Sequence, residues 1–361
     1  MAITTGTDPD VMRAREARRE KRFALITRSA GWFSVLGLGF VTPLLKIAAG
    51  DSFRAQRGEI VQSLVIPLVG IGLFIAAWAI LAPQVQTSLG AIPGPAAVWS
   101  QAGQLLDDHA RERGKADAFY ARQEERNAKL TETGKADRVK WRTYTGAPTY
   151  VDQIVTSLKT VVLGFVFATV VAVPLGIAAG LSRSVGGAIN PLIQIFKPVS
   201  PLAWLPIVTM VVSATYMDAS EAMPKSMLIS AIVVTLCSLW PTLINTSLGV
   251  ASVDKDLTNV GRVLQLPTRR MISKIVLPSS LPLIFTGLRL SLGVGWMVLI
   301  AAEMLSQNPG LGKFVWDEFQ NGSSDSLARI MVAVLTIGIV GFMLDRLMYA
   351  LQAAFTFSKQ R

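Results

Sequence analysis

The stretch TVVLGFVFATVVAVPLGIAAGLS, from Thr160 to Ser182, contains no charged side chain. A helix rises ~1.5 Å per residue, so about 20 mostly apolar residues cross the ~30 Å hydrocarbon layer of a membrane. This stretch therefore predicts a transmembrane helix, and it decides the fold class because similar stretches recur. The others are approximately Ser63 to Ala82, Pro198 to Met217, Ser226 to Val250, Leu281 to Ala302 and Ile330 to Phe355. We expect an all-α polytopic membrane protein with six transmembrane helices.

The composition agrees with this fold class and excludes several kinds of chemistry. Of 361 residues, 51% are hydrophobic and only 16% are charged, which is too apolar for a soluble domain of this size. Cys237 and His109 are the single cysteine and histidine, so a disulfide, a zinc site and a histidine-assisted nucleophile are all disfavoured. No stretch fits the phosphate-binding pattern G-x-x-x-x-G-K-[ST], so ATP must be bound elsewhere.

Basic residues fix the direction of the spans. The segment Val253 to Lys274 carries five Lys or Arg residues, and the positive-inside rule places it in the cytoplasm. Counting spans from this segment places residues 83–155 outside the cell and both termini inside. The short loop at Arg183 also falls inside. The net charge of +11 could also suggest binding to nucleic acid. We interpret its densest cluster, from Arg13 to Arg28, as a cytoplasmic topology signal instead, because the cluster lies just before an apolar segment.

The N-terminal third divides into segments of different composition. Residues 1–30 form a basic cytoplasmic N-terminus. Gly31 to Leu45 is a short apolar stretch, and we expect residues 31–62 to form an interfacial amphipathic helix and a connector, with a signal peptide as the alternative. The first span at 63–82 is followed by the charged extracytoplasmic insertion 83–155, predicted to be solvated helix and loop. That insertion either caps the outer mouth or receives a soluble partner. Residues 156–361 form a five-helix core.

The most informative segment is the cytoplasmic loop ASVDKDLTNVGRVLQLPTRRMISKIVLPSSLP, residues 251–282. Acidic residues near its start suit the positive end of a helix dipole, and apolar residues then recur at helical spacing until Pro267 interrupts. A second amphipathic turn follows, and we expect Pro278 and Pro282 to end it. A short helix, break and helix across the span ends, apolar above and basic below, suits docking into a groove on another protein. Its apolar residues are Val260, Val263, Leu264, Met271, Ile272 and Ile275.

The loop resembles that of ABC-type import permeases, which reads E-A-A, three residues, G, nine residues, I-x-L-P. Ile275, Leu277 and Pro278 match the end of the pattern, whereas NVG (259–261) occupies the E-A-A positions and Gln265 replaces the glycine. The reading NVGRVL is similar to the branch that imports nitrate, bicarbonate, taurine and alkanesulfonates. Four further stretches resemble that branch, most closely its nitrate permeases: KPVSPLAWLPI (197–207), SLWPTLINTSLGV (238–250), FTGLRLSLGVGWMVLIAAEML (285–305) and NPGLGKFVWDEFQNGS (308–323).

This resemblance, which runs from about Val155 to the C-terminus, implies a multi-pass subunit of the bacterial inner membrane. Its implied partners are a second copy of itself, two cytoplasmic ATPase subunits that bind ATP and Mg, an extracytoplasmic solute-binding protein and membrane lipid. The chain itself would hold no cofactor or metal and would not be an enzyme. The residues implied to couple to the ATPase are Asp256, Asn259, Val260, Gly261, Arg262, Leu264, Gln265, Leu266, Pro267, Ile275, Leu277 and Pro278.

Candidates for the translocation path come from polar or aromatic residues in the spans: Arg289, Trp296, Ser200, Trp204 and Asn245. A charge within a span is costly and marks function by default, although Arg289 could also snorkel or pair with Asp345. The tryptophans could equally be interfacial anchors. Backbone amides near Pro198, Pro201 and Pro206 offer another place for an anion.

Two further expectations concern the fifth span. Gly287, Gly293 and Gly295 give it a small-residue face that could pack against another helix, consistent with a two-fold seam. Glu303, near its outer end, is expected to lie at a wetted mouth or a dimer contact.

Competing functions remain open at this point. The same architecture could import taurine, an alkanesulfonate or bicarbonate instead of nitrate. A different class, a stand-alone channel or secondary transporter, would make the cytoplasmic loop a mere connector. A membrane enzyme is the least supported, because the chain offers no constellation of acid, base or metal ligands.

Overall fold

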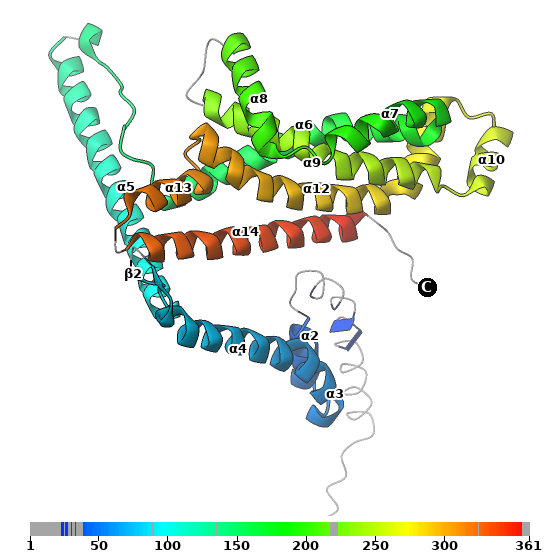
Figure 1. Ribbon diagram of the computed structural model, residues 1–361, viewed down its shortest axis with the longest axis horizontal. Coiled ribbons are helices and arrows are strands. Elements are labelled where there is room, and N and C mark those ends of the chain that lie inside the picture. The colour runs from blue at the N-terminus through cyan, green and yellow to red at the C-terminus, as the bar shows by residue number, and fades with distance from the viewer. Residues whose placement is uncertain are drawn as a thin grey trace, which may run out of the picture. The chain divides into compact units, whose positions relative to one another are not determined.

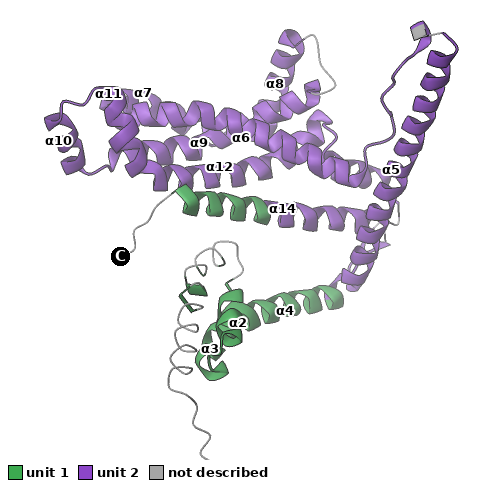
Figure 2. Cartoon of the chain, turned by 180° about the vertical axis from the view of Figure 1, so that it is seen from behind, with its two compact units in different colours: residues 1–80, 342–361 green, residues 81–341 purple. Residues whose placement is uncertain are grey.

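The computed structural model describes residues 23–24, 26–27, 30, 33, 39–87, 90–134, 136–216, 223–323 and 325–355, and these are almost entirely helical. They divide into two compact units, which are described separately (Figure 2). One unit contains residues 1–80 and 342–361, and the other contains residues 81–341. The basic N-terminus up to residue 22, most of the stretch 31–38 and the last six residues, including Lys359 and Arg361, lie outside the described residues.

In the first unit, the predicted first span belongs to a longer helix. α2 (Val41–Ala48) is followed by α3 (Phe53–Ile60), a π-helical turn (Val61–Val65) and α4 (Ile66–Leu81), and the last three form part of one helix, Phe53–Gln84. The helix that contains the predicted span, Ser63 to Ala82, therefore begins ten residues earlier, at Phe53. The π-helical turn Val61–Val65 lies just before Pro67, which has no N–H to donate to the preceding turn of the helix. The change of hydrogen-bond register at the π turn therefore accommodates the proline without ending the helix. Of the expected interfacial helix, α2 is the described part.

The charged insertion, predicted to be helix and loop, forms a long helix with an extended return segment. A short hairpin of β1 (Gln86–Thr87) and β2 (Gly90–Ala91) leads into α5 (Pro95–Glu132), and the chain returns through a 3-10 turn (Ala136–Arg138). The side chain of Gln123 donates to the Arg142 carbonyl at 3.1 Å and accepts from the Arg142 N–H at 2.8 Å. Asn127 donates to the Lys140 carbonyl at 3.1 Å. Side-chain amides thus satisfy the backbone of a segment that has no regular secondary structure.

Three helices form the centre of the second unit: α6 (Tyr150–Leu181), α9 (Lys225–Ala251) and α12 (Leu277–Ser306), which lie side by side in Figure 1. Glycines let α6 approach α9 closely. A Cβ added at Gly164 would lie 2.7 Å from the Ala231 carbonyl oxygen, and one at Gly176 would lie 2.9 Å from the Leu243 carbonyl oxygen. Because both contacts advance in the same chain direction, α6 and α9 run parallel.

A bent pair of helices connects α6 to α9. α7 (Arg183–Phe196) and α8 (Pro201–Thr215) meet at 103° and satisfy the criteria for a span only together. The predicted third span, Pro198 to Met217, corresponds to α8 alone, which rises only about 22 Å. Arg183, expected in a short loop, begins α7. Since α6 and α9 are parallel, the bent pair returns the chain to the end of the bundle where α6 begins. The described residues therefore contain five long helices that could span a membrane, and a sixth candidate if the bent pair is counted as one span.

The remaining elements close the unit at one end of the bundle. α13 (Leu311–Asn321) follows α12, and α14 (Ser326–Phe355) follows α13. The Tyr150 ring, at the start of α6, lies 4.8 Å from the Phe314 ring of α13, centroid to centroid, and its hydroxyl donates to Thr336 of α14 at 2.7 Å. These contacts gather α6, α13 and α14 at the end where α5 lies, opposite the end from which α10 projects (Figure 1).

Candidate functional site

The loop between α9 and α12 folds into a helical elbow. α10 (Lys255–Val263) begins at Asp254, whose carboxylate accepts the Asp256 N–H at 2.9 Å, and Asp256 adds a second acidic residue in the first turn. Acidic groups at this position satisfy free N–H groups and favour the positive dipole end. After the break at Pro267, α11 (Thr268–Met271) starts the second arm of the elbow.

The turn between the two arms explains an unusual sequence position. The Leu266 N–H bonds to the Gly261 carbonyl at 3.0 Å and the Gln265 N–H to the Arg262 carbonyl at 2.9 Å, which is the Schellman arrangement of a helix C-terminus. Gln265 has φ 48°, in the left-handed region that glycine adopts most readily. The permease pattern has its glycine at this position, and the geometry accounts for that preference.

Gly261 is the point where the two arms touch. It is buried, and an added Cβ would lie 2.6 Å from Sδ of Met271 and 2.9 Å from Cδ1 of Ile275. The absence of a side chain at 261 therefore allows α10 to fold back on the start of the next helix.

α10 and the residue after it also expose four apolar side chains. The exposed fractions are 47% for Leu257, 54% for Val260, 82% for Val263 and 64% for Leu264. The sequence pattern correctly predicted a helix with apolar side chains at helical spacing; these side chains are exposed, whereas the Gly261 backbone packs against Met271 and Ile275. An apolar surface on a charged, projecting helix is the feature expected of a docking site for another protein.

The second arm continues into the bundle without interruption. α11, a π-helical turn (Ile272–Val276) and α12 form one helix, Thr268–Ser306, of 39 residues. The expectation that Pro278 and Pro282 end the amphipathic turn is therefore wrong. The π turn directly precedes Pro278 and shifts the hydrogen-bond register, so the missing proline N–H leaves the helix intact. The remaining coupling candidates lie on the elbow as half-buried or exposed residues: Asn259, Arg262, Leu266, Ile275, Leu277 and Pro278.

The five path candidates lie at the start of α8 and along α9 and α12. Ser200 caps the start of α8, accepting the Leu202 N–H at 3.3 Å, and Trp204 stacks near Phe196 at the bend, with ring centroids 5.8 Å apart. Asn245 and the half-buried Arg289 lie along α9 and α12.

Trp296 has a structural role within the chain. It is buried, and its indole N–H donates to the Ile337 carbonyl of α14 at 2.9 Å. The ring thus packs α12 against α14.

The structure bears on two expectations about the fifth span, the packing of its glycines and the exposure of Glu303. Gly287 and Gly295 face α9, where added Cβ atoms would meet the Asn245 Cβ at 2.8 Å and a Val234 methyl at 3.2 Å, whereas only Gly293 faces open space. Gly287 and Gly295 therefore pack against another helix as expected, and that helix is α9 of the same chain. Glu303 is 0% exposed and accepts from Ser157 at 2.8 and 2.9 Å, so it lies in the interior of the unit, away from any wetted surface. The sequence analysis missed Ser157.

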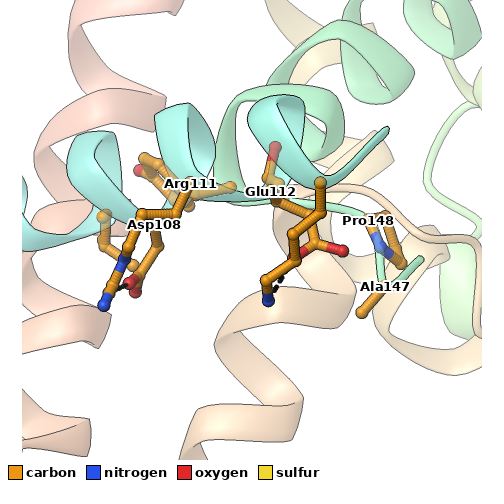
Figure 3. A pocket seen from close by; sticks show the side chains of 9 residues that line it. Asp108, Arg111, Glu112, Ala147 and Pro148 are labelled. Atoms are coloured by element: carbon orange, nitrogen blue, oxygen red, sulfur yellow. Dashed lines mark hydrogen bonds and ion pairs between the residues drawn. The ribbon is translucent and has the colours of Figure 1, made fainter. Parts of the chain in front are cut away.

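At the other end of the bundle, a cleft of about 480 Å³ separates α5 from the start of α6 (Figure 3). Its charged side chains neutralise one another: Asp108 pairs with Arg111, and Glu112 pairs with Lys115 at 3.0 Å. Tyr144 donates to Glu112 at 2.6 Å; this bond, followed by the Lys115 contact, lowers the pKa of Glu112, and it raises the pKa of Tyr144. The cleft therefore carries no excess charge with which to hold an ion.

Comparison with known proteins matches the region that contains the elbow. The profile of a family described as "Binding-protein-dependent transport system inner membrane component" matches residues 172–356. The nitrate import permease protein NrtB of Synechococcus elongatus is 36% identical over 195 residues, covering 54% of this chain and 66% of that protein. The NrtB of Synechocystis is 36% identical over 209 residues, covering 58% of this chain and 71% of that protein.

A second group of relatives has a different named solute. The bicarbonate transport system permease protein CmpB of Synechococcus elongatus is 32% identical over 293 residues, which covers 81% of this chain and 89% of that protein. Among solved structures, the MetNI methionine ABC transporter in inward facing conformations matches with a TM-score of 0.48 and 12% identity, over 57% of this chain and 96% of that chain.

Proposed function

This chain belongs to the family of inner membrane components of binding-protein-dependent transport systems, and we propose that it is the membrane-spanning subunit of an ATP-driven importer of nitrate. The single observation that carries the proposal is the elbow. It presents α10, a charged helix with exposed apolar side chains, at one end of the bundle and joins it through a tight turn to the helix Thr268–Ser306. Such a device transmits the movement of a separate protein to the interior of a membrane bundle.

The proposed assembly contains two copies of this chain, with the solute path between them. Two cytoplasmic ATPase subunits bind ATP and Mg and grip the two α10 helices. An extracytoplasmic solute-binding protein delivers the anion from the side of α5, and both termini of this chain lie in the cytoplasm. ATP binding closes the ATPases, draws the two elbows together and tips the helices between inward-open and outward-open arrangements.

Nitrate is proposed because NrtB proteins are among the most similar relatives, at 36% identity. Bicarbonate is the second candidate, since the CmpB alignment covers 89% of that protein at 32% identity. Taurine and alkanesulfonates remain candidate solutes only because the sequence motifs resemble the branch of permeases that imports them together with nitrate and bicarbonate. Selection among these anions is expected to lie mainly with the binding protein, so the sequence of this chain discriminates little between them.

The test is the ATPase rate of the complete complex, reconstituted in lipid with its binding protein. Nitrate is expected to raise the rate in a saturable manner, whereas taurine and an alkanesulfonate should leave it at its basal value. A response to bicarbonate and none to nitrate would replace the proposed solute. Uptake by this chain alone, without ATP or partners, would instead support a channel or secondary transporter and overturn the importer.

A further inference from the structure

The outer end of the helix Thr268–Ser306 contains a buried carboxylate that the proposed function does not use. Glu303 is 0% exposed, and the groups around it all donate to it. Ser157 Oγ lies 2.9 and 2.8 Å from its two oxygens, Asn308 Nδ2 lies 3.3 Å from Oε1, and the Gly312 N–H lies 3.0 Å from Oε2. A carboxylate that is fully removed from water remains stable only when it is bonded in this way.

These bonds connect three helices, two consecutive ones and a third that is about 150 residues earlier in the sequence. Ser157 belongs to α6, Glu303 to α12, and Gly312 to the first turn of α13. Ser157 also accepts the Leu311 N–H at 2.8 Å, and Asn308 donates to Thr160 of α6 at 3.2 Å. We call the set of Ser157, Thr160, Glu303 and Asn308 the outer latch.

The latch replaces the ordinary cap of α13. The residue preceding this helix is Gly310, which has no side chain to satisfy the free N–H groups of the first turn. Those N–H groups, on Leu311 and Gly312, are bonded instead by the side chains of α6 and α12. The start of α13 is therefore held by its neighbours and not by its own sequence.

Close packing makes the latch rigid. An added Cβ at Gly310 would overlap the Glu303 carboxylate, and one at Gly312 would overlap the Ile300 carbonyl oxygen and lie 2.9 Å from the Glu303 Cβ. The turn between α12 and α13 thus wraps directly onto the carboxylate. The outer end of α12 cannot move away from α13 or α6 without breaking several buried hydrogen bonds.

The latch also connects to the arm formed by α5. Arg113 of α5 pairs with Asp152, and His109 lies 2.7 Å from the hydroxyl of Thr149, the residue that caps α6. Asp152 and Ser157 are one and a half turns apart on α6. The elbow is at the inner end of a continuous helix, and the latch, α13, α6 and α5 meet at its outer end.

We propose that Glu303 is a positioning residue that fixes α13 and the start of α6 to the outer end of the helix Thr268–Ser306, and thereby couples the cytoplasmic elbow to the outer surface. The proposal rests on the proposed function, because the two coupled events are ATPase engagement inside and binding-protein docking outside. Coupling of this kind is reciprocal, so docking outside must change the ATPase inside.

The variant Glu303→Gln tests the latch with almost no change in shape. A glutamine amide offers one oxygen acceptor and one NH₂ donor, so either the Gly312 N–H or the Asn308 NH₂ must face a donor. In the complete complex, we expect stimulation of the ATPase by nitrate-loaded binding protein to fall about tenfold, since one buried contact is lost. Basal ATPase and co-purification with the ATPase subunit should stay at wild-type values.

The matched control is Glu318→Gln. Glu318 is also a buried carboxylate of this region, but it accepts from Ser326 at 2.9 Å and Arg329 at 3.1 Å, which join α13 to α14. This variant is expected to keep its stimulation. Equal losses in the two variants would indicate general sensitivity of α13 and would overturn the specific role of Glu303.

A rescue experiment separates positioning from folding. In a Cys237→Ala background, cysteines replacing Tyr150 and Phe314 can be joined by a short bismaleimide, which ties α6 to α13 without the latch. The cross-link should restore stimulation in the Glu303→Gln chain. Ser157→Ala, which removes a different member, should reproduce the loss if Glu303→Gln does not assemble. Wild-type stimulation in Glu303→Gln refutes the latch, whereas absent stimulation in the wild type refutes the proposed function itself.

Discussion

Replacing Val263 by glutamine should weaken binding of the ATPase subunit without disturbing the elbow. Val263 is 82% exposed in the chain alone, so almost its whole side chain is available to be buried by a partner. Full burial of a valine side chain contributes ~1.5–3 kcal/mol, and the exposed share therefore accounts for about 1.2–2.5 kcal/mol. At 1.36 kcal/mol per factor of ten, the dissociation constant should rise about 8- to 70-fold. Glutamine is a good helix former and carries no charge, so α10 should remain folded.

The measurement is the equilibrium affinity of the detergent-purified chain for its ATPase subunit on a biosensor surface. Leu106→Gln is the matched control, because Leu106 is also an exposed apolar residue but lies on α5, at the opposite end of the bundle. Its affinity should equal that of the wild type. A Val263→Gln chain with unchanged affinity and unchanged thermal stability would refute the assignment of the exposed α10 face as the docking surface.

Gly164→Ala should lower the free energy of unfolding by about 2–3 kcal/mol, because the added Cβ would lie 2.7 Å from a carbonyl oxygen of α9. Gly293→Ala, whose added Cβ meets open space, should be neutral or stabilising by up to about 1 kcal/mol. Thermal unfolding in detergent measures both effects. Gln265→Gly should stabilise the elbow turn by up to about 1 kcal/mol by relieving its left-handed backbone, seen as slower amide exchange there. The Glu112 pKa is lowered by its Tyr144 bond, so its contribution to the stability of the α5 region is present above the ordinary carboxyl pKa and lost as pH falls through the lowered value. Glu112→Gln should remove this acid dependence of amide exchange between about pH 3 and 6.

Hydropathy located the long spans but not their breaks. The apolar runs beginning near Thr160 and Ser226 correspond to α6 and α9, because a charge-free run of this length has few alternatives to a spanning helix. The third predicted span differed, since α7 is amphipathic and meets the criteria for a span only together with α8, from which it is bent by 103°. Composition averaged over a window cannot detect a bend.

Local rules failed where hydrogen-bond register or helix geometry decided the outcome. Pro278 was expected to end a helix, but a π turn before it removes the conflict, and no composition signal marks such a turn. The glycines of the fifth span were treated as one face, although at about 100° per residue Gly295 lies near Gly287 and Gly293 lies on the other side.

Glu303 was placed by its distance from the span end, which says nothing about burial. The donors around it come from α6 and from the turn after α12, so only the tertiary fold brings them together.

The glycine-lined contact between α6 and α9 has a further consequence for how this molecule can change shape. Carbonyl oxygens of one helix lie where side-chain carbons of the other would stand, so a slide of one residue along the shared axis would force atoms to overlap. We therefore expect α6 and α9 to move as one rigid body during a transport cycle. Rearrangement within the bundle is then left to the chain between them, at the sharp corner of residues 197–200, which lies between the end of α7 and the start of α8.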